Sequence, residues 1–209
     1  MTLGLTNPDI AVDLDNYGPP MELGCLFSRR GPIHIEIGSG KGTFLLNQAR
    51  AHPGINYLGI EWANKYYLYS VDRMRRWQLQ NVRILCADAR YFIERYLYKE
   101  GVDAYHIYFP DPWPKRRHHK RRFFRPTNVT HLVRTLVSGG ELRTATDHAE
   151  YFEIIKNLLL RDSAPTAIFE PIEFLPASTA GTGEWVGSNF ERKYLKQGRP
   201  IYTLALRKL

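Results

Sequence analysis

The chain has 209 residues, with 29 lysines and arginines against 21 aspartates and glutamates, a formal net charge of +8 at pH 7. With 44% hydrophobic residues it can build one core, which disfavours widespread disorder. Cys25 and Cys86 form neither a CxxC pair nor a metal spacing, so we expect no disulfide scaffold and no metal site. We find no signal peptide pattern and no apolar stretch near the roughly 18 residues that span a bilayer, so we expect a cytoplasmic protein without membrane association.

Residues 1–32 contain four prolines and little hydrophobic periodicity, and we expect an irregular lead-in before a single domain over 33–209. From there, short apolar runs alternate with longer amphipathic segments. Strands are predicted at 33–37, 56–61, 82–87, 104–109 and 140–146, and helices after them at 42–52, 63–80, 89–98, 126–137 and 148–161. Two late strands, at 167–175 and 200–207, are separated by a segment rich in Gly, Ser and Thr at 177–187.

This order predicts an α/β fold with a mostly parallel sheet and helices on both faces. A late strand without its own helix indicates an antiparallel addition to that sheet. In open sheets of this kind, ligands bind beyond the carboxyl ends of the strands. The residues that end each strand are therefore the candidates for chemistry.

The first strand ends in EIGSGKG, residues 36–42. Glycines here allow a sharp turn and a close approach of a ligand to the backbone. A phosphate-binding P-loop is excluded because Ile35 stands at its first glycine and Gly42 follows the lysine, while Thr43 weakens a dinucleotide fingerprint. The shorter GxGxG turn suits a ligand without a pyrophosphate; a tight turn with no ligand role is the alternative.

Acids end the first three predicted strands. Glu61 follows Gly40 by 21 residues, a distance at which dinucleotide folds place a carboxylate on ribose hydroxyls, although a solvated acid is the alternative. Asp88 ends the third strand, where it either reaches an adenine edge or caps the next helix. Together with Glu36, these acids indicate a pocket for a neutral or cationic nucleoside and not for a phosphate.

The fourth strand leads into YFPDPWP, residues 108–114. Pro110 and Pro112 restrict the backbone on both sides of Asp111, which favours a functional site. The alternative is a rigid loop around a half-buried Trp113.

A basic run follows at residues 115–122, with six formal positive charges and no acid, which leaves +2 for the rest of the chain. Such a run is usually a solvated surface. This one directly follows the candidate loop and is flanked by Trp113, Phe123 and Phe124. Because basic side chains neutralise phosphates and aromatic rings stack on bases, the run favours a nucleic-acid partner.

Together these residues resemble the bacterial, single-subunit tRNA (guanine-N7-)-methyltransferase family. The sequences that carry the resemblance are EIGSGKG, GIE at 59–61, ADA at 87–89, FPDPWPK at 109–115 with the basic residues 117–122, TATD at 144–147 and SNFE at 188–191. The first motifs occur in many S-adenosylmethionine enzymes, whereas FPDPW before a lysine and a basic run is far more specific. The resemblance implies the Rossmann-like class I methyltransferase fold, with a seven-stranded, mostly parallel sheet whose last strand is antiparallel.

The resemblance also implies S-adenosylmethionine as donor, guanine 46 in the variable loop of tRNA as acceptor, and no obligate protein partner. It implies that the cofactor is bound by Glu36, Gly38, Gly40, Glu61, Asp88, Ala89 and Asp111. It also implies that Asp111 takes part in methyl transfer. It implies that the substrate is contacted by Lys115, Asp147, Ser188, Asn189, Phe190 and Glu191. The remaining RNA contacts would come from Arg117, His118, His119, Lys120, Arg121 and Arg122. The chain departs from the family at Ser188, where threonine is common, and at Pro114, where histidine is frequent.

Guanine N7 carries a lone pair and no proton, so it attacks a methyl donor without a general base. Positioning should supply most of the catalysis, and Asp111 would stabilise the positive charge that develops on the guanine. Asp147 and Glu191 would accept hydrogen bonds from N1 and N2 of guanine; a helix cap is the alternative for Asp147, and a core position is the alternative for Phe190. The competing functions are methylation of another RNA atom or of protein, a non-catalytic RNA-binding module and, weakest, a nicotinamide oxidoreductase.

Overall fold

The computed structural model describes residues 9–160, 168–174, 193 and 196–209. Five consecutive strands of the chain run parallel to one another in the sheet: β2 (Ile33–Ile37), β3 (Asn56–Glu61), β4 (Val82–Cys86), β5 (Val102–Tyr108) and β6 (Leu136–Thr146). The last strand, β8 (Tyr202–Lys208), pairs antiparallel with β6 and with β7 (Phe169–Ile172). The predicted mostly parallel sheet with an antiparallel last strand is therefore confirmed.

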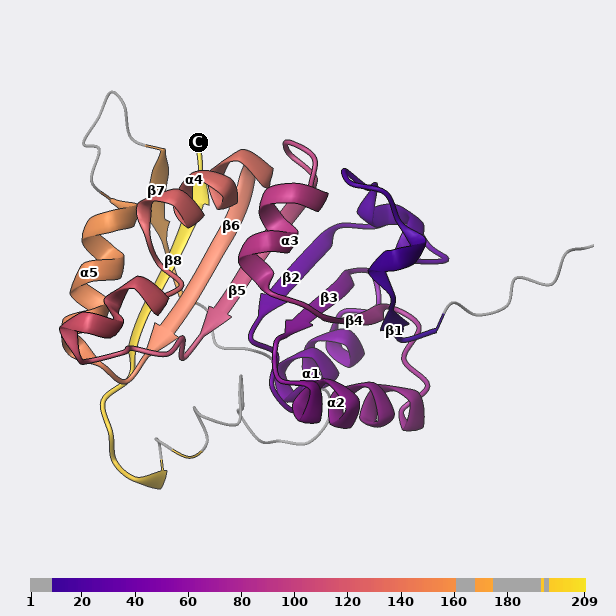
Figure 1. The fold of residues 1–209 in the computed structure, drawn as a ribbon, viewed down its shortest axis with the longest axis horizontal. Coiled ribbons are helices and arrows are strands. Elements are labelled where there is room, and N and C mark those ends of the chain that lie inside the picture. The colour runs from indigo at the N-terminus through magenta and orange to yellow at the C-terminus, as the bar shows by residue number, and fades with distance from the viewer. Residues whose placement is uncertain (1–8, 161–167, 175–192, 194–195) are drawn as a thin grey trace, which may run out of the picture.

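An eighth strand comes from the segment that the sequence left irregular. β1 (Ala11–Val12) pairs in parallel with β4, and the sheet order is β1-β4-β3-β2-β5-β6-β8-β7 (Figure 1). Two short 3-10 helices, η1 (Leu14–Asn16) and η2 (Leu23–Leu26), follow β1 along the chain. Met21 and Phe27 are buried here in the same hydrophobic cluster as strand residues of the sheet. Residues 9–32 thus pack onto the sheet.

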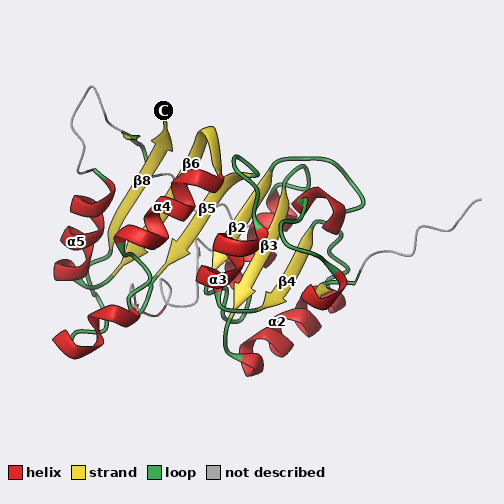
Figure 2. Cartoon of the chain, turned by 45° about the horizontal axis from the view of Figure 1, so that its top comes forward, coloured by secondary structure: helices red, strands yellow, loops and turns green. Residues whose placement is uncertain are grey.

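One helix follows each of the strands β2 to β6. These are α1 (Thr43–Ala51), α2 (Asn64–Arg76), α3 (Ala89–Tyr96), α4 (Pro126–Thr135) and α5 (Ala149–Leu159). α1 and α2 share a hydrophobic cluster with Tyr57, whereas α3, α4 and α5 share another with Leu58. Because neighbouring residues of a strand point to opposite faces, the helices cover both sides of the sheet (Figure 2).

The predicted bounds match two strands and differ from the observed bounds at other elements. Strands 33–37 and 56–61 agree with β2 and β3 residue for residue. The helix predicted at 63–80 ends at Arg76, shortly before Gln78, whose φ of 51° cannot continue a helix. The strand predicted at 140–146 begins already at Leu136, because the chain pairs with β5 through an irregular register near Val102. The segment 177–187 lies outside the described residues.

Candidate active site

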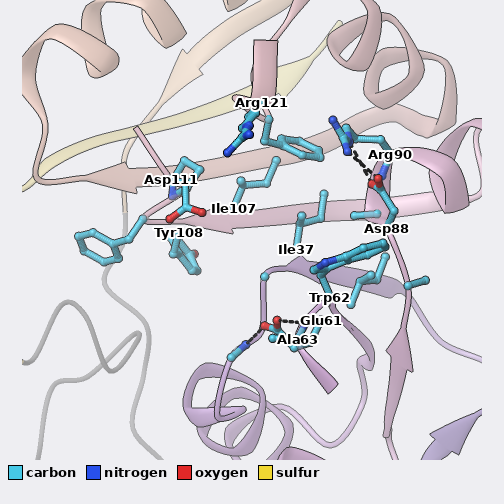
Figure 3. Close-up of a pocket in the computed structure, with 18 of the residues that line it drawn as sticks. Ile37, Glu61, Trp62, Ala63, Asp88, Arg90, Ile107, Tyr108, Asp111 and Arg121 are labelled. Atoms are coloured by element: carbon cyan, nitrogen blue, oxygen red, sulfur yellow. Dashed lines mark hydrogen bonds and ion pairs between the residues drawn. The ribbon is translucent and has the colours of Figure 1, made fainter. Parts of the chain in front are cut away.

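A pocket of about 830 Å³ lies where β2, β3, β4 and β5 end (Figure 3). This is the edge of the sheet at which a ligand was predicted. Six of the seven residues assigned to the cofactor line it: Gly38, Gly40, Glu61, Asp88, Ala89 and Asp111. The seventh, Glu36, is not among the residues that line the pocket.

The glycine turn forms one part of the wall because only glycine adopts its backbone easily. Gly38 and Gly40 have φ angles of +76° and +54°, and the Gly38 N–H donates to the Ile60 carbonyl at 2.8 Å. A Cβ added at Gly38 would meet no atom within 4 Å, so packing does not require glycine there. The left-handed backbone does, and it leaves open space beside the chain.

Glu61 joins the glycine turn to the start of α2. Its Oε2 accepts from the Gly40 N–H and its Oε1 from the Ala63 N–H, both at 2.7 Å, and the residue is 8% exposed. The spacing of 21 residues noted in the sequence therefore places these two groups in direct contact. Each carboxylate oxygen keeps lone-pair capacity for a ligand hydroxyl.

Glu36 is a buried acid with an unsatisfied oxygen. It is 4% exposed, and its Oε2 has no hydrogen-bond partner within the described residues. Burial raises the pKa of Glu36 well above its usual value, and the nearby charge of Glu61 raises it further. Because a buried polar atom without a partner is costly, this carboxyl group is suited to accept a ligand's donor.

Asp88 caps the start of α3, the alternative role that the sequence left open for it, and it also lines the pocket. Its Oδ1 accepts from the Arg90 N–H at 2.9 Å at the start of α3, and the Arg90 guanidinium grips both carboxylate oxygens at 3.0 and 2.6 Å (Figure 3). These contacts with Arg90 hold the pKa of Asp88 below its usual value. Asp88 thus faces the pocket as a fixed, ionised group.

Asp111 stands on the opposite wall, in a loop with an unusual backbone. Phe109 and Trp113 have φ angles of 49° and 40°, a left-handed conformation that costs non-glycine residues on the order of 1–3 kcal/mol each. The Phe109 N–H donates to the Ala145 carbonyl at 2.7 Å, which anchors the loop to β6. Figure 3 places the exposed Asp111 carboxylate between Arg121 and Tyr108.

The basic run is a folded 3-10 helix, η3 (Arg116–Arg121), packed on Trp113. The Arg121 guanidinium lies 5.0 Å from the centre of the Trp113 ring, and the His118 ring meets its edge at 5.6 Å. Trp113 is therefore partly covered by the protein's own side chains, and it also lines the pocket. Lys120 and Arg121 reach the pocket.

The remaining basic positions divide into exposed and buried ones. Lys115 and Arg117 are exposed and are not among the residues that line the pocket. His119 is partly exposed and lies beside the Pro114 carbonyl at 3.4 Å. Arg122 departs from the expected surface position, because it is 4% exposed and its Nε–H donates to the Pro112 carbonyl.

The residues assigned to the guanine base are only partly described. Asp147 directly follows β6 and pairs with Arg199, whose Nη1 lies 2.8 Å from the Asp147 Oδ2. It does not cap α5, because His148 occupies that position and its Nδ1 accepts from the Tyr151 N–H. Ser188, Asn189, Phe190 and Glu191 lie outside the described residues.

Several pocket residues were not predicted from the sequence. Trp62, 73% exposed, follows the strand-end acid and lies beside Asp88 on the same side of the pocket (Figure 3). Tyr66 from α2 is a further lining residue. Tyr108, the last residue of β5, stands near Asp111. Position directly after or at a strand end was the signal that could have identified Trp62 and Tyr108.

The buried His106 contacts the Tyr108 hydroxyl and is in turn contacted by the half-buried His34. His34 Nδ1 and His106 Nε2 are 3.1 Å apart, and His106 Nδ1 and the Tyr108 hydroxyl are 3.0 Å apart. Burial lowers the pKa of His34 to about 4 and lowers the pKa of His106 well below its usual value. Both rings are therefore neutral at pH 7, and each has one donor and one acceptor to share along the chain.

These groups fit S-adenosylmethionine. The cofactor carries a positive sulfonium, an ammonium group and ribose hydroxyls, which match a pocket surrounded by carboxyl groups. The open glycine turn allows its close approach, and the unsatisfied Glu36 oxygen offers a buried acceptor.

Comparisons with known proteins agree with this geometry. A family model described as a methyltransferase (Methyltransf_4) matches residues 30–204. A tRNA (guanine-N(7)-)-methyltransferase of Alkalilimnicola ehrlichii is 34% identical over 99% of this chain and 85% of its own length. One of Rhodopirellula baltica is 34% identical over 98% of this chain and 79% of its own length.

Solved structures support the fold. An S-adenosylmethionine-dependent O-methyltransferase from Thermotoga maritima superposes with a TM-score of 0.55 at 18% identity, covering 87% of this chain and 60% of its own. A methyltransferase from Streptococcus mutans, in complex with S-adenosylhomocysteine, gives a TM-score of 0.53 at 11% identity, with 86% and 90% covered. The family model and the relatives that match nearly the whole sequence show that the chain belongs to the tRNA (guanine-N(7)-)-methyltransferase family.

Proposed function

We propose that this protein transfers the methyl group of S-adenosylmethionine to N7 of guanine 46 in the variable loop of tRNA, forming 7-methylguanosine. The observation that carries the proposal is one arrangement: a pocket lined by strand-end acids, with Asp111 on a loop that leads directly into an exposed basic helix. Membership of the family supports the same reaction.

The acids of the pocket would hold the donor. Glu61 and Glu36 would accept from its hydroxyl and ammonium groups, while Asp88 and the ring of Trp62 would border its base. When bound, S-adenosylmethionine supplies a methyl group on a positively charged sulfur. The glycine turn would let the donor lie against backbone atoms without a steric clash.

Asp111 would act on the guanine side. Its carboxylate is exposed at the pocket, so a base brought there would lie near a fixed negative charge. That charge would stabilise the cation that forms when N7 gains a methyl group, and it would be effective because the loop needs no rearrangement during the reaction. N7 has a lone pair, so no side chain has to remove a proton.

The basic helix would bind the tRNA backbone. Arg116, Arg117, Lys120 and Arg121 are exposed on η3, and Lys120 and Arg121 extend to the pocket itself. Phosphates held there would place a base splayed out of the RNA over Asp111. Asp147, with Glu191, would recognise the guanine edge, and Asp147 would then share its carboxylate with Arg199.

Two further expectations belong to this proposal. No helix in the described part of the chain is long and apolar enough to cross a membrane. A cytoplasmic location and activity without an obligate protein partner are proposed because tRNA is the substrate and one chain provides both the pocket and the basic helix.

The decisive experiment compares two tRNA transcripts that differ only at position 46. Each is incubated with the purified protein and labelled S-adenosylmethionine, and the nucleosides are identified after digestion. We expect 7-methylguanosine from the transcript with guanine 46 and none from the transcript with adenine 46. Equal methylation of both transcripts would overturn the assignment of the position, and a different methylated nucleoside would overturn the assignment of the atom.

Salt provides an independent test of the two binding surfaces. Because phosphate contacts release counterions, raising the salt concentration should weaken tRNA binding steeply and leave cofactor binding nearly unchanged. Equal salt sensitivity of the two would contradict binding through η3.

A further inference from the structure

The basic run contains one arginine that does not behave as a surface residue. Arg122 is 4% exposed, whereas Arg116, Arg117, Lys120 and Arg121 are all exposed. A buried guanidinium is costly unless its charge and its N–H groups are used by the protein. The contacts of Arg122 therefore indicate what it does.

Arg122 is held between a loop carbonyl and an aromatic ring. Its Nε–H donates to the Pro112 carbonyl at 2.7 Å, and its guanidinium carbon lies 4.9 Å from the centre of the Tyr151 ring. The nearest acid, Glu150, is 66% exposed and lies 4.0 Å from Nη2, which is too far for a hydrogen bond. The stacking platform itself is rigid, because Tyr151 is fully buried on α5 and its hydroxyl accepts from the Phe124 N–H at 3.3 Å.

The carbonyl that Arg122 binds belongs to the residue after Asp111. Pro112 has no N–H, so its carbonyl is the only backbone group through which this residue can be held by a hydrogen bond. The next residue, Trp113, has the left-handed φ of 40°. A hydrogen bond from a buried charged donor at this point stabilises a backbone that is otherwise unfavourable.

The charges of Arg122 and Asp111 both influence the ring on which Arg122 stacks. Burial raises the pKa of Tyr151 to about 12; the charge of Arg122 opposes this rise and the charge of Asp111 adds to it. Both charges therefore act on the same phenol.

We propose that Arg122 is a positioning residue for methyl transfer, which fixes the Asp111 loop against α5 and does not contact RNA. The assignment rests on the proposed function in one respect, namely that Asp111 acts in the reaction. It changes the role expected for the last member of the basic run: five cationic side chains of the run face solvent, and the sixth supports the catalytic loop from inside.

The test compares Arg122→Gln and Arg122→Lys with a surface variant, Arg117→Gln. Arg122→Gln should lower kcat at saturating tRNA and cofactor about 10- to 100-fold, as expected when a reacting group is misplaced. Arg122→Lys should lose a similar factor, because a lysine cannot combine the stacking and the directed N–H of a guanidinium. In both variants the dissociation constant for tRNA and its dependence on salt should stay at the wild-type values.

Arg117→Gln should show the opposite behaviour. It should weaken tRNA binding and reduce the slope of log affinity against log salt by about 0.7 to 0.9, the change for one lost phosphate contact. Arg95→Gln, an exposed arginine of α3 outside the pocket, serves as the control for loss of one positive charge and should change neither kcat nor the slope.

Folding is monitored by the cofactor-binding stoichiometry, which should stay at one per chain in every variant. If Arg122→Gln reduces the salt slope as Arg117→Gln does, or if both Arg122 variants keep the wild-type kcat, the proposal is wrong. If both lose kcat only in proportion to lost binding stoichiometry, the role is structural and the proposal is equally wrong.

The proposed function can fail separately. In that case wild-type protein would form no 7-methylguanosine, and the loop would be tested by amide hydrogen exchange at Asp111 and Trp113. Faster exchange in Arg122→Lys than in wild type would show that Arg122 stabilises the loop, independently of the reaction. Unchanged exchange would overturn it.

Discussion

The carboxylates on the two walls of the pocket differ in their hydrogen-bond partners. On the glycine-turn wall, formed by Gly38, Gly40, Glu61 and Asp88, the acids already have partners: two backbone amides for Glu61 and the Arg90 guanidinium for Asp88. On the loop wall, residues 109–113, no described residue makes a hydrogen bond or an ion pair with the Asp111 carboxylate. One wall has fixed acids, and the other has a free acid on a fixed backbone.

This difference separates binding from chemistry. A carboxylate held by two amides cannot move, so it suits a ligand whose hydroxyl groups must be found in one place. A carboxylate without protein partners keeps its charge for a group that becomes positive during a reaction. The cost of holding Asp111 ready is carried by the strained backbone at Phe109 and Trp113.

The largest effect is expected when the free acid is neutralised. Asp111→Asn should lower the rate of methyl transfer about 100-fold or more, the loss seen when one preorganised group that stabilises developing charge is removed. Its tRNA affinity should change far less. Single-turnover methylation and equilibrium tRNA binding measure the two quantities, and a comparable loss of both would show that Asp111 serves binding or folding instead.

A smaller effect is expected on the fixed wall. Glu61→Gln places an amide N–H₂ against the N–H of Gly40 or Ala63, a clash of donors that costs about 1–3 kcal/mol. We expect cofactor affinity to fall about tenfold and thermal stability to decrease, with tRNA affinity unchanged. Calorimetric titration and thermal unfolding provide the values; loss of tRNA affinity with retained cofactor affinity would reverse the assignment of the two walls.

The lowered pKa of His34 predicts a dependence of stability on pH. The pKa of His34 is lowered to about 4 in the folded chain from 6.5, so the unfolded chain binds more protons between these values. This contribution to stability is fully present above pH 6.5 and is lost as the pH falls towards 4. His34→Gln should reduce the slope of unfolding free energy against pH near pH 5 by about 1 kcal/mol per pH unit. Denaturant unfolding at several pH values measures it, and an unchanged slope would mean that His34 is not buried as a neutral ring.

The smallest effect is expected for the partner of Asp88. Arg90→Gln should raise the pKa of Asp88, because Arg90 is the main cause of its depression. The unfolding free energy should fall by no more than about 1 kcal/mol, since the pair is partly exposed and the cap to the Arg90 N–H remains. Titration of Asp88 by NMR and urea unfolding test this, and a much larger loss of stability would show that the pair holds the wall together.

Most residues of the glycine-turn wall could be predicted from local sequence. The glycine turn, the acid 21 residues later and the strand-end aspartate are each readable because a buried parallel strand is a short apolar run whose end is easily located. β1 was missed because two residues carry no periodicity, and the prolines around it indicate irregular chain. The capping of α5 by His148 instead of Asp147 depends on a one-residue choice that propensity does not resolve.

The alternation of strands and helices, the glycine turn and the position of Asp111 directly before a basic run could all be predicted from the sequence, because they depend on neighbours along the chain. Tertiary contacts alone make Arg122 buried while Arg121 is exposed, bring Arg121 and His118 against Trp113, and bring His106 to the Tyr108 hydroxyl. Residues of one type in one run are equivalent in sequence, and they become different only when α5 and the loop after β5 meet. The burial of a charge is set by contacts between distant segments, which no local pattern records.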